Sequence, residues 1–451
     1  MRSLILIGAI MATSTASANP SSIDIPFETY TLDNGLEVIL HEDHTTPVVH
    51  VEVWYHVGSK DEPMGRSGFA HLFEHLMFNG SEHADGEYFA PLQPFGARIN
   101  GTTNTDRTNY YETVPSNVLE RALWMEADRM GFLLGALGQD KLDNQRDVVR
   151  NERRQNYEIA PYAKSRQAIA EALWPSSHPY HRLTIGSHED LEAANLDDVR
   201  KFFETWYLPN NATLAIVGDI DVAKTKEWVK AYFGPIAKGP QPSPITEATA
   251  VAPKAATITL EDNVQLPRLY YVWQSAPFLK TGDADLDVLS LVLSNGKTSR
   301  LHKRLVFDEH IAKDVYAGQW SSQLGSSYYV VATAAPGHSP KELQASIDDE
   351  LEKLLNEGPS DEEVERAING WRKSFFGNIE SVAGKAGLLQ RYNHYLGDPN
   401  WVHKDLERYL AITPTSVRAW AQKTLAPEHR VTVIVNPKAA NTKHADRGVA
   451  Q

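Results

Sequence analysis

Two stretches of the chain resemble each other at a constant offset of 218 residues, and this repeat restricts the possible folds more than any other feature. Residues 197–219 and 415–435 share a helical pattern, then a proline at Pro209 or Pro427, then an apolar run of β character. A repeat of this length does not suit a solenoid, whose units are far shorter. The chain is therefore predicted to contain two homologous domains.

The boundary between these domains is marked by a change in composition. Residues 236–256 are rich in Pro, Ala and Thr and show no hydrophobic periodicity, which is typical of an extended linker. At 451 residues, the chain is long enough for a sizeable core on each side of this linker. We expect an N-terminal domain over residues 19–235 and a C-terminal domain over residues 257–451.

Each half of the chain mixes strand-like and helix-like segments. Residues 36–43 and 48–59 show the apolar or alternating pattern of strands. Residues 116–134 have helical spacing, and residues 339–358 begin with a Ser-Pro cap and end on a glycine, as helices do. Because the strands come in runs and the helices come in runs, the pattern favours an α+β fold over a doubly wound sheet.

The composition excludes several classes of partner and ligand. The formal net charge is −14 and the pI about 5.7, so no basic face is predicted that would neutralise the phosphates of a nucleic acid. There are no cysteines, which leaves His, Asp and Glu as ligands for any zinc ion. After the N-terminus, no stretch is long and apolar enough to predict a transmembrane helix.

The N-terminus has the three parts of a secretory signal peptide. Arg2 supplies a positive charge, residues 4–11 are apolar, and residues 16–18 (Ala-Ser-Ala) form a small-residue cleavage site. Residues 1–18 are therefore predicted to be removed, so that the mature chain begins at Asn19 and is exported, with the periplasm as the expected location. A buried N-terminal strand is the alternative interpretation of the same residues.

His71, Glu74 and His75 form an H-x-x-E-H motif within the stretch SGFAHLFEHLMFNGS. In a helix, positions i and i+4 share one face and i+3 lies beside them, so two imidazoles can hold one metal ion next to a carboxylate. This is the inverted form of a zinc-peptidase motif, in which the carboxylate acts as general base. The surrounding residues are apolar, so the polar triplet needs partners, and either a metal or a structural hydrogen-bond network would supply them.

Several further stretches carry a resemblance to a known family. In chain order they are INGTTNTDRTNYYETVP, QRDVVRNERRQNYE, HPYHRLTIGSHEDL, YLPNNATLAIVGD and NGKTSRLHKRL. With the motif, they make the sequence resemble the two-domain bacterial subunits of the pitrilysin and mitochondrial-processing-peptidase family of zinc peptidases, from Phe27 to Val435. The resemblance implies two α/β-sandwich domains, each a mainly antiparallel sheet with helices packed on it, that form half of a clamshell chamber.

The resemblance also implies a third metal ligand and a cofactor. The family places this ligand 77 residues after the second motif histidine, where this chain has Glu152. One Zn²⁺ per chain would then be held by His71, His75 and Glu152, with Glu74 as general base and then proton donor. Relatives carry another glutamate near the metal, seven positions before the third ligand, and this chain has Gln145 there.

Substrate-binding residues are implied by the same resemblance. Relatives use the strand that corresponds to INGTT as an exposed edge that pairs with the substrate backbone, and the residues at those positions are Asn100, Gly101, Thr102 and Thr103. Phe78, which follows the motif, is assigned to substrate binding as well. Gly101 stands where relatives usually carry alanine. A polar β edge that ends in a hairpin turn is the structural alternative.

One pair of substrate-clamping residues is missing. Relatives that act as single catalytic subunits carry an arginine and a tyrosine seven residues apart in the C-terminal half, where this chain has Val306 and Lys313. Arg304 and Tyr316 lie nearby, but they are twelve residues apart. We therefore expect a zinc endopeptidase that is the zinc-bearing subunit of a heterodimer, whose homologous partner lacks the zinc motif and supplies Arg and Tyr. The alternative is a non-catalytic binding or scaffold subunit that retains the fold.

Overall fold

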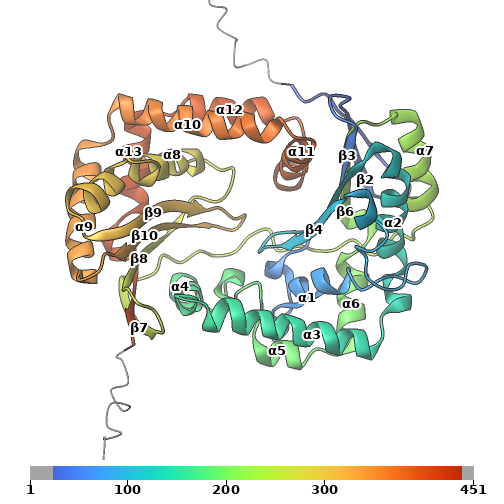
Figure 1. Ribbon diagram of the computed structural model, residues 1–451, viewed down its shortest axis with the longest axis horizontal. Coiled ribbons are helices and arrows are strands. Elements are labelled where there is room, and N and C mark those ends of the chain that lie inside the picture. The colour runs from blue at the N-terminus through green and yellow to red at the C-terminus, as the bar shows by residue number, and fades with distance from the viewer. Residues whose placement is uncertain (1–23, 439–451) are drawn as a thin grey trace, which may run out of the picture.

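The computed structural model describes residues 24–438, which form two α/β halves that lie side by side (Figure 1). Each half has one β-sheet with helices packed against it, as the sequence predicts. The predicted signal peptide, residues 1–18, and its cleavage site lie outside the described residues. Within the described part of the chain, no helix combines the length and the apolar character needed to cross a membrane.

The N-terminal sheet has six strands in the order β1-β2-β6-β3-β5-β4, and all neighbours are antiparallel except β2 and β6. This order leaves β4 as an outer strand, next to the hairpin that joins it to β5. The strands are β1 (Glu28–Thr31), β2 (Glu37–Glu42), β3 (Val48–Tyr55), β4 (Arg98–Thr103), β5 (Thr108–Pro115) and β6 (Ala212–Gly218).

The C-terminal sheet repeats this path with five strands in the order β7-β11-β8-β10-β9, and again only one pair, β7 and β11, is parallel. Strand β1 has no counterpart in the described part of the C-terminal half. The two repeated sequence segments end in β6 and β11, which occupy equivalent places in the two sheets. The strands are β7 (Ala256–Asp262), β8 (Arg268–Ser275), β9 (Ala312–Trp320), β10 (Ser326–Ala334) and β11 (Val431–Pro437).

The helices cover both sheets and fill the connections between strands. The helices of the N-terminal half are α1 (Phe69–Leu76), α2 (Leu119–Ala136), α3 (Gln139–Arg153), α4 (Lys164–Leu173), α5 (His188–Glu192), α6 (Leu196–Trp206) and α7 (Val222–Phe233), with a π-helical turn η5 (Arg154–Ile159) after α3. Those of the C-terminal half are α8 (Asp283–Ser294), α9 (Pro340–Glu357), α10 (Asp361–Ile379), α11 (Val382–Leu396), α12 (Val402–Leu410) and α13 (Pro414–Thr424), with a π-helical turn η8 (His302–Asp308).

Helix α9 illustrates how closely local sequence signals set the helix ends. Ser339 caps its N-terminus by accepting a hydrogen bond from the backbone N–H of Glu342, and a proline occupies the first turn. The helix ends at Gly358, whose φ of 80° is unfavourable for residues with a side chain. The predicted Ser-Pro start and glycine end are thus both present.

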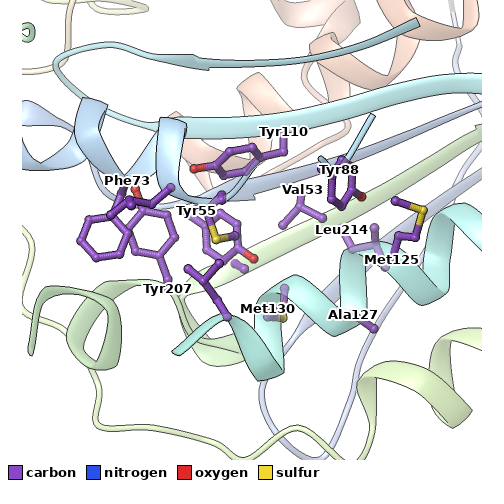
Figure 2. Packing of buried hydrophobic residues seen from close by; sticks show 14 of the residues in the cluster. Val53, Tyr55, Phe73, Tyr88, Tyr110, Met125, Ala127, Met130, Tyr207 and Leu214 are labelled. Carbon is purple, nitrogen blue, oxygen red and sulfur yellow. The ribbon is translucent and has the colours of Figure 1, made fainter. Parts of the chain in front are cut away.

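The larger core lies between the N-terminal sheet and the helices on one of its faces. Val53 and Tyr55 of β3 and Leu214 of β6 point into it, where they meet Phe73 of α1 and Met130 of α2 (Figure 2). All five side chains are buried. Because interiors are close-packed, this apolar anchorage holds the opposite, polar face of α1 in a defined orientation.

One helix of each half packs on the sheet of the other half. Helix α11 lies against β3 and β6 of the N-terminal sheet (Figure 1), where the Gln390 side chain donates to the carbonyls of Glu52 and Thr213 at 3.0 and 2.9 Å. Helix α4 packs against β7, β8 and β11 of the C-terminal sheet, with Ile169 and Leu173 in the shared core. Side-chain packing therefore joins the halves, in addition to residues 237–255, which form no helix or strand.

A buried histidine pair lies where α11 meets the N-terminal sheet. The rings of His56 and His394 stack with centroids 4.9 Å apart, and their Nδ1 atoms are hydrogen-bonded at 2.6 Å. Burial lowers the pKa of His56 to about 4 and lowers the pKa of His394 well below its usual value. Both rings are therefore neutral in the folded protein at neutral pH.

This pair makes the stability of the protein depend on pH. Below pH 6.5 the unfolded chain binds a proton at His56 and the folded chain does not, so stability is lost as the pH falls from about 6.5 to about 4. Replacing His56 by glutamine is expected to reduce the difference in unfolding free energy between pH 7 and pH 5 by about 2 kcal/mol. Urea unfolding at the two pH values measures this, with the exposed His429→Gln as control; an unchanged difference in His56→Gln would contradict the expectation.

Candidate metal centre

The motif residues of α1 meet Glu152 of α3 on a partly exposed surface. The side chains of His71 and His75 are 13% and 23% exposed, and that of Glu152 is 34% exposed. The Nε2 atoms of His71 and His75 lie 3.6 and 3.4 Å from Glu152 Oε2, and all three ligand atoms lie within 4.8 Å of one another. No other group of three metal-ligating side chains converges in this way within residues 24–438.

The spacing of these three atoms fits a zinc ion. Ligand atoms bound to one tetrahedral Zn²⁺ are separated by about 3.3 Å, given Zn–N and Zn–O bonds of about 2 Å. The two distances from Glu152 are already close to that separation. Three protein ligands leave a fourth position open, which is the arrangement of catalytic rather than structural zinc sites.

Helix α1 begins at a glycine and is capped by a carboxylate from a distant position. Gly68, its N-cap, has a φ of 91°, and a Cβ there would come within 2.8 Å of the Ile185 carbonyl oxygen. Glu62 accepts hydrogen bonds from the backbone N–H groups of Gly68 and Ala70 at 3.0 and 2.9 Å, and burial raises the pKa of Glu62 to about 8. Sequence inspection does not identify Glu62, because a capping side chain normally sits at the N-cap position itself.

The other end of α1 is tied to α3 through Gln145, the residue that replaces a glutamate of the relatives. The Gln145 amide donates to Asn79 Oδ1 at 3.1 Å, and Asn79 in turn donates to the backbone carbonyl of His75 at 2.9 Å. Gln145 thus supports the end of the motif helix that carries the second histidine. A neutral amide can donate to Asn79 in a way that a glutamate carboxylate cannot.

The protonation states in the cluster suit metal binding and proton transfer. Burial lowers the pKa of His71 to about 4, which keeps its imidazole neutral, the form that ligates metals. A hydrogen bond from His75 lowers the pKa of Glu152, which keeps this carboxylate charged. Burial raises the pKa of Glu74, although the neighbouring Thr103 hydroxyl and His75 oppose this rise. Glu74 therefore has an increased proton affinity, which suits a general base. The imidazole and carboxylate groups beside it are ligands that zinc prefers.

Strand β4 presents a free edge next to this cluster. In the hairpin after β4, the Asn104 N–H donates to the carbonyl of Arg107, which makes them a hydrogen-bonded pair. Because bonded and non-bonded pairs alternate along an antiparallel ladder, the backbone groups of Gly101 and Thr103 point away from β5. An extended peptide can add to such an edge as a further strand.

The remaining residues assigned to substrate binding lie on or under this strand. The Asn100 side chain accepts a hydrogen bond from the Gly101 N–H at 2.9 Å, and the Thr102 hydroxyl donates to Asn109 at 2.6 Å. Phe78 is half-buried beneath the strand, and a Cβ at Gly101 would come within 3.1 Å of its ring. Phe78 therefore contacts the inner side of β4 and not its free edge.

Comparison with known proteins adds an independent line of evidence. Residues 37–178 match the family profile "Insulinase (Peptidase family M16)", and residues 193–370 match "Peptidase M16 inactive domain". The chain is 30% identical over 396 residues to the zinc protease PqqE of Helicobacter pylori, which covers 87% of this chain and 88% of that protein. The chain belongs to peptidase family M16. It is also 24% identical over 410 residues to the uncharacterised zinc protease YmxG of Bacillus subtilis, with 90% of this chain and 97% of that protein covered.

Solved structures of two bacterial proteases share the fold. A protease from Helicobacter pylori superimposes with a TM-score of 0.85 at 28% identity, over 91% of this chain and all of that one. The periplasmic protease PqqL of Escherichia coli superimposes with a TM-score of 0.74 at 19% identity, over 92% of this chain and 48% of that one. At 19% identity, the likeness to PqqL concerns the fold alone. The family profiles and the relative in Helicobacter pylori confirm the family resemblance that was inferred from the sequence.

Val306 and Lys313 occupy the two positions at which the family resemblance implies a substrate-binding arginine and tyrosine. Val306 lies in η8 and packs against the C-terminal core, and Lys313 is exposed on β9. Arg304 is paired with the carboxylates of Glu309, Asp349 and Glu350, so its guanidinium already has anionic partners. Of the residues near these positions, Tyr316 is 58% exposed on β9.

Proposed function

We propose that the chain is a zinc-dependent endopeptidase in which His71, His75 and Glu152 hold one Zn²⁺ and Glu74 is the catalytic base. The observation that carries the proposal is the convergence of ligand atoms from α1 and α3 to within 4.8 Å. The match to an inactive domain begins at residue 193, after all four residues. A complete ligand set with a carboxylate beside it favours a catalytic subunit over a scaffold that only retains the fold.

The bound ion would act as a Lewis acid that polarises the scissile carbonyl and makes an attacking water molecule more acidic. The Glu74 carboxylate takes the proton of that water as it adds to the carbonyl carbon, and then passes it to the nitrogen of the leaving amine. The raised pKa of Glu74 favours this role, because the carboxyl group has to hold the proton between the two steps.

The peptide would bind as an added strand on β4, through the backbone groups of Gly101 and Thr103, and its carbonyl would replace the Asn100 side chain as the acceptor of the Gly101 N–H. The backbone is common to all peptides, so this mode positions the scissile bond without demanding a particular sequence. Asn100 and Thr102 stabilise the edge strand itself. Phe78 supports the strand from its inner side.

We also propose where the enzyme acts and how it assembles. The exported chain would begin at Asn19 and act in the periplasm as the zinc-bearing subunit of a heterodimer. Residues 19–235 would be the zinc-binding domain, and residues 257–451 a homologous domain without a metal motif, joined by the linker 236–256. A second, related subunit would supply the arginine and tyrosine that Val306 and Lys313 replace.

Metal analysis combined with a peptidase assay tests the core of the proposal. The purified chain is expected to hold about one zinc per molecule, and a chelator should abolish peptide cleavage in any assembly that contains the chain. His71→Ala should lose both zinc and cleavage, and the exposed His429→Ala should keep both. Cleavage at the same rate by zinc-free protein would rule out the mechanism. Peptide binding without cleavage, both alone and with a partner subunit, would favour a scaffold subunit.

A further inference from the structure

A cavity of about 590 Å³ lies between the two halves, close to the metal centre. One wall is formed by η5, α4 and the segment after it, and the opposite wall by β8, β9 and β10 of the C-terminal sheet. Aromatic side chains from both halves line it, among them Tyr162, Trp174, Tyr270 and Trp320. A volume of this size can hold one or two amino-acid side chains of a bound peptide.

The charged residues of this cavity are all of one sign. Of the described residues that line it, only Arg166, Arg182 and Arg268 carry a formal charge, although the protein as a whole has a net charge of −14. An anion that enters the cavity therefore meets positive charge and no lining carboxylate. Low-dielectric aromatic walls strengthen that attraction.

The three arginines keep free hydrogen-bonding capacity. Arg268 lies 3.8 Å from the ring centroid of Tyr162 and donates to the Thr333 hydroxyl, while Arg182 donates to backbone carbonyls. The Arg166 guanidinium lies over a tyrosine ring at 5.1 Å. Within residues 24–438, none of the three has a carboxylate partner at ion-pair distance. Guanidinium groups form their strongest hydrogen bonds with carboxylates, so an acidic side chain would complete this site.

The cavity lies next to the metal centre and to the end of strand β4. Asn156 belongs to its wall, and the side chain of Asn156 lies 3.4 Å from Glu152 Oε1. Thr105, in the turn after the edge strand β4, also lines the cavity. A peptide added to β4 with its scissile bond near Glu74 therefore has the cavity within reach of its neighbouring residues.

We propose that this cavity is a specificity site that binds an acidic residue of the substrate next to an aromatic or aliphatic one. This inference rests on the proposed function, since it names the class of peptide that the enzyme selects. The arginines bind the carboxylate and the tyrosine and tryptophan rings cover the apolar neighbour. The enzyme consequently prefers acidic, aromatic-containing peptides over neutral and basic ones.

The test measures binding separately from cleavage. Three fluorescein-labelled peptides that differ only in a Glu-Phe-Glu, Gln-Phe-Gln or Lys-Phe-Lys segment are titrated against the full-length Glu74→Gln protein, and fluorescence anisotropy reports the affinity. The acidic peptide should bind about tenfold more tightly than the neutral one and the basic peptide more weakly, with the difference reduced by added salt. Equal affinity for all three peptides would overturn the inference.

Arginine variants connect this preference with the cavity. Arg166→Gln and Arg268→Gln, each made in the Glu74→Gln protein, should bring the acidic peptide close to the affinity of the neutral one. Arg154→Gln, at an exposed residue at the start of η5 that does not line the cavity, should retain the preference. Arg166 is exposed, so its variant is expected to fold even if Arg268→Gln does not. If Arg166→Gln keeps the full preference, the cavity is not the site.

The two hypotheses fail in different ways. If wild-type protein cleaves the neutral peptide but the anisotropy shows no preference for the acidic one, the specificity site is wrong and the zinc peptidase stands. If no peptide is cleaved by the chain, either alone or with its partner subunit, but the acidic preference depends on Arg166, the cavity binds acidic peptides and the catalytic proposal is wrong.

Discussion

Replacement of Glu74 by glutamine is expected to lower kcat for peptide cleavage by about 10²- to 10⁴-fold while the zinc content stays at the wild-type level. Glutamine has nearly the same shape as glutamate, but it cannot take the proton of the attacking water. Because Glu74 is not one of the three residues whose ligand atoms converge, the metal should remain bound. Peptide-cleavage assays give kcat, and zinc analysis of the same samples gives the metal content.

The matched control is Glu87→Gln, an exposed residue in the segment between α1 and β4. It should leave both kcat and zinc content unchanged, which shows that the loss does not follow from any change of charge in this region. His71→Ala differs from Glu74→Gln in a predictable way, since it should lose the metal together with the activity. Wild-type turnover by Glu74→Gln would show that another group moves the proton.

The second large effect is expected from a partner subunit. Adding a related subunit that lacks H-x-x-E-H and carries the arginine and tyrosine should raise kcat/KM by about 10²-fold or more over the isolated chain. An arginine and a tyrosine hydroxyl can orient the peptide and stabilise the oxyanion that develops during attack. Val306 is packed against a core and Lys313 is exposed on β9, so neither residue replaces that pair.

Comparing the chain alone with the mixture decides this point, with light scattering to establish which species is present. Arg304→Gln and Tyr316→Phe test for local substitutes in the isolated chain. Arg304 is paired with three carboxylates, so Arg304→Gln should leave the cleavage rate unchanged. Tyr316 lines the cavity and is the residue more able to contact a peptide. If the wild-type monomer is fully active and the Tyr316→Phe monomer is less active, no partner is needed and this tyrosine is the substitute.

Local patterns in the sequence were sufficient for much of the fold. The 218-residue repeat corresponds to α6 followed by β6 and to α13 followed by β11, at equivalent places in the two sheets. The residues 339–358 form α9 with both predicted end signals. These features follow from short-range physics, because strand alternation, helix caps and glycine conformations depend on a few neighbouring residues.

The motif was likewise visible in the sequence, since 3.6 residues per turn place His71 and His75 on one face of any helix that contains them. The proposed third ligand could not be found in this way. Glu152 lies on another helix, and no local rule brings α3 against α1, so only the resemblance to a family pointed to this residue. The structure brings the three side chains together through the packing of both helices on the N-terminal core.

Other features depended on the tertiary structure entirely. Glu62 caps α1 from outside the helix, and α4 and α11 each pack on the sheet of the opposite half. Hydrophobic periodicity shows that a helix has an apolar face, but it does not show which sheet covers that face. The cavity with its three arginines lies between the halves for the same reason: its two walls, up to Thr184 and from Arg268 onward, are more than eighty residues apart in sequence, and long-range packing alone places them together.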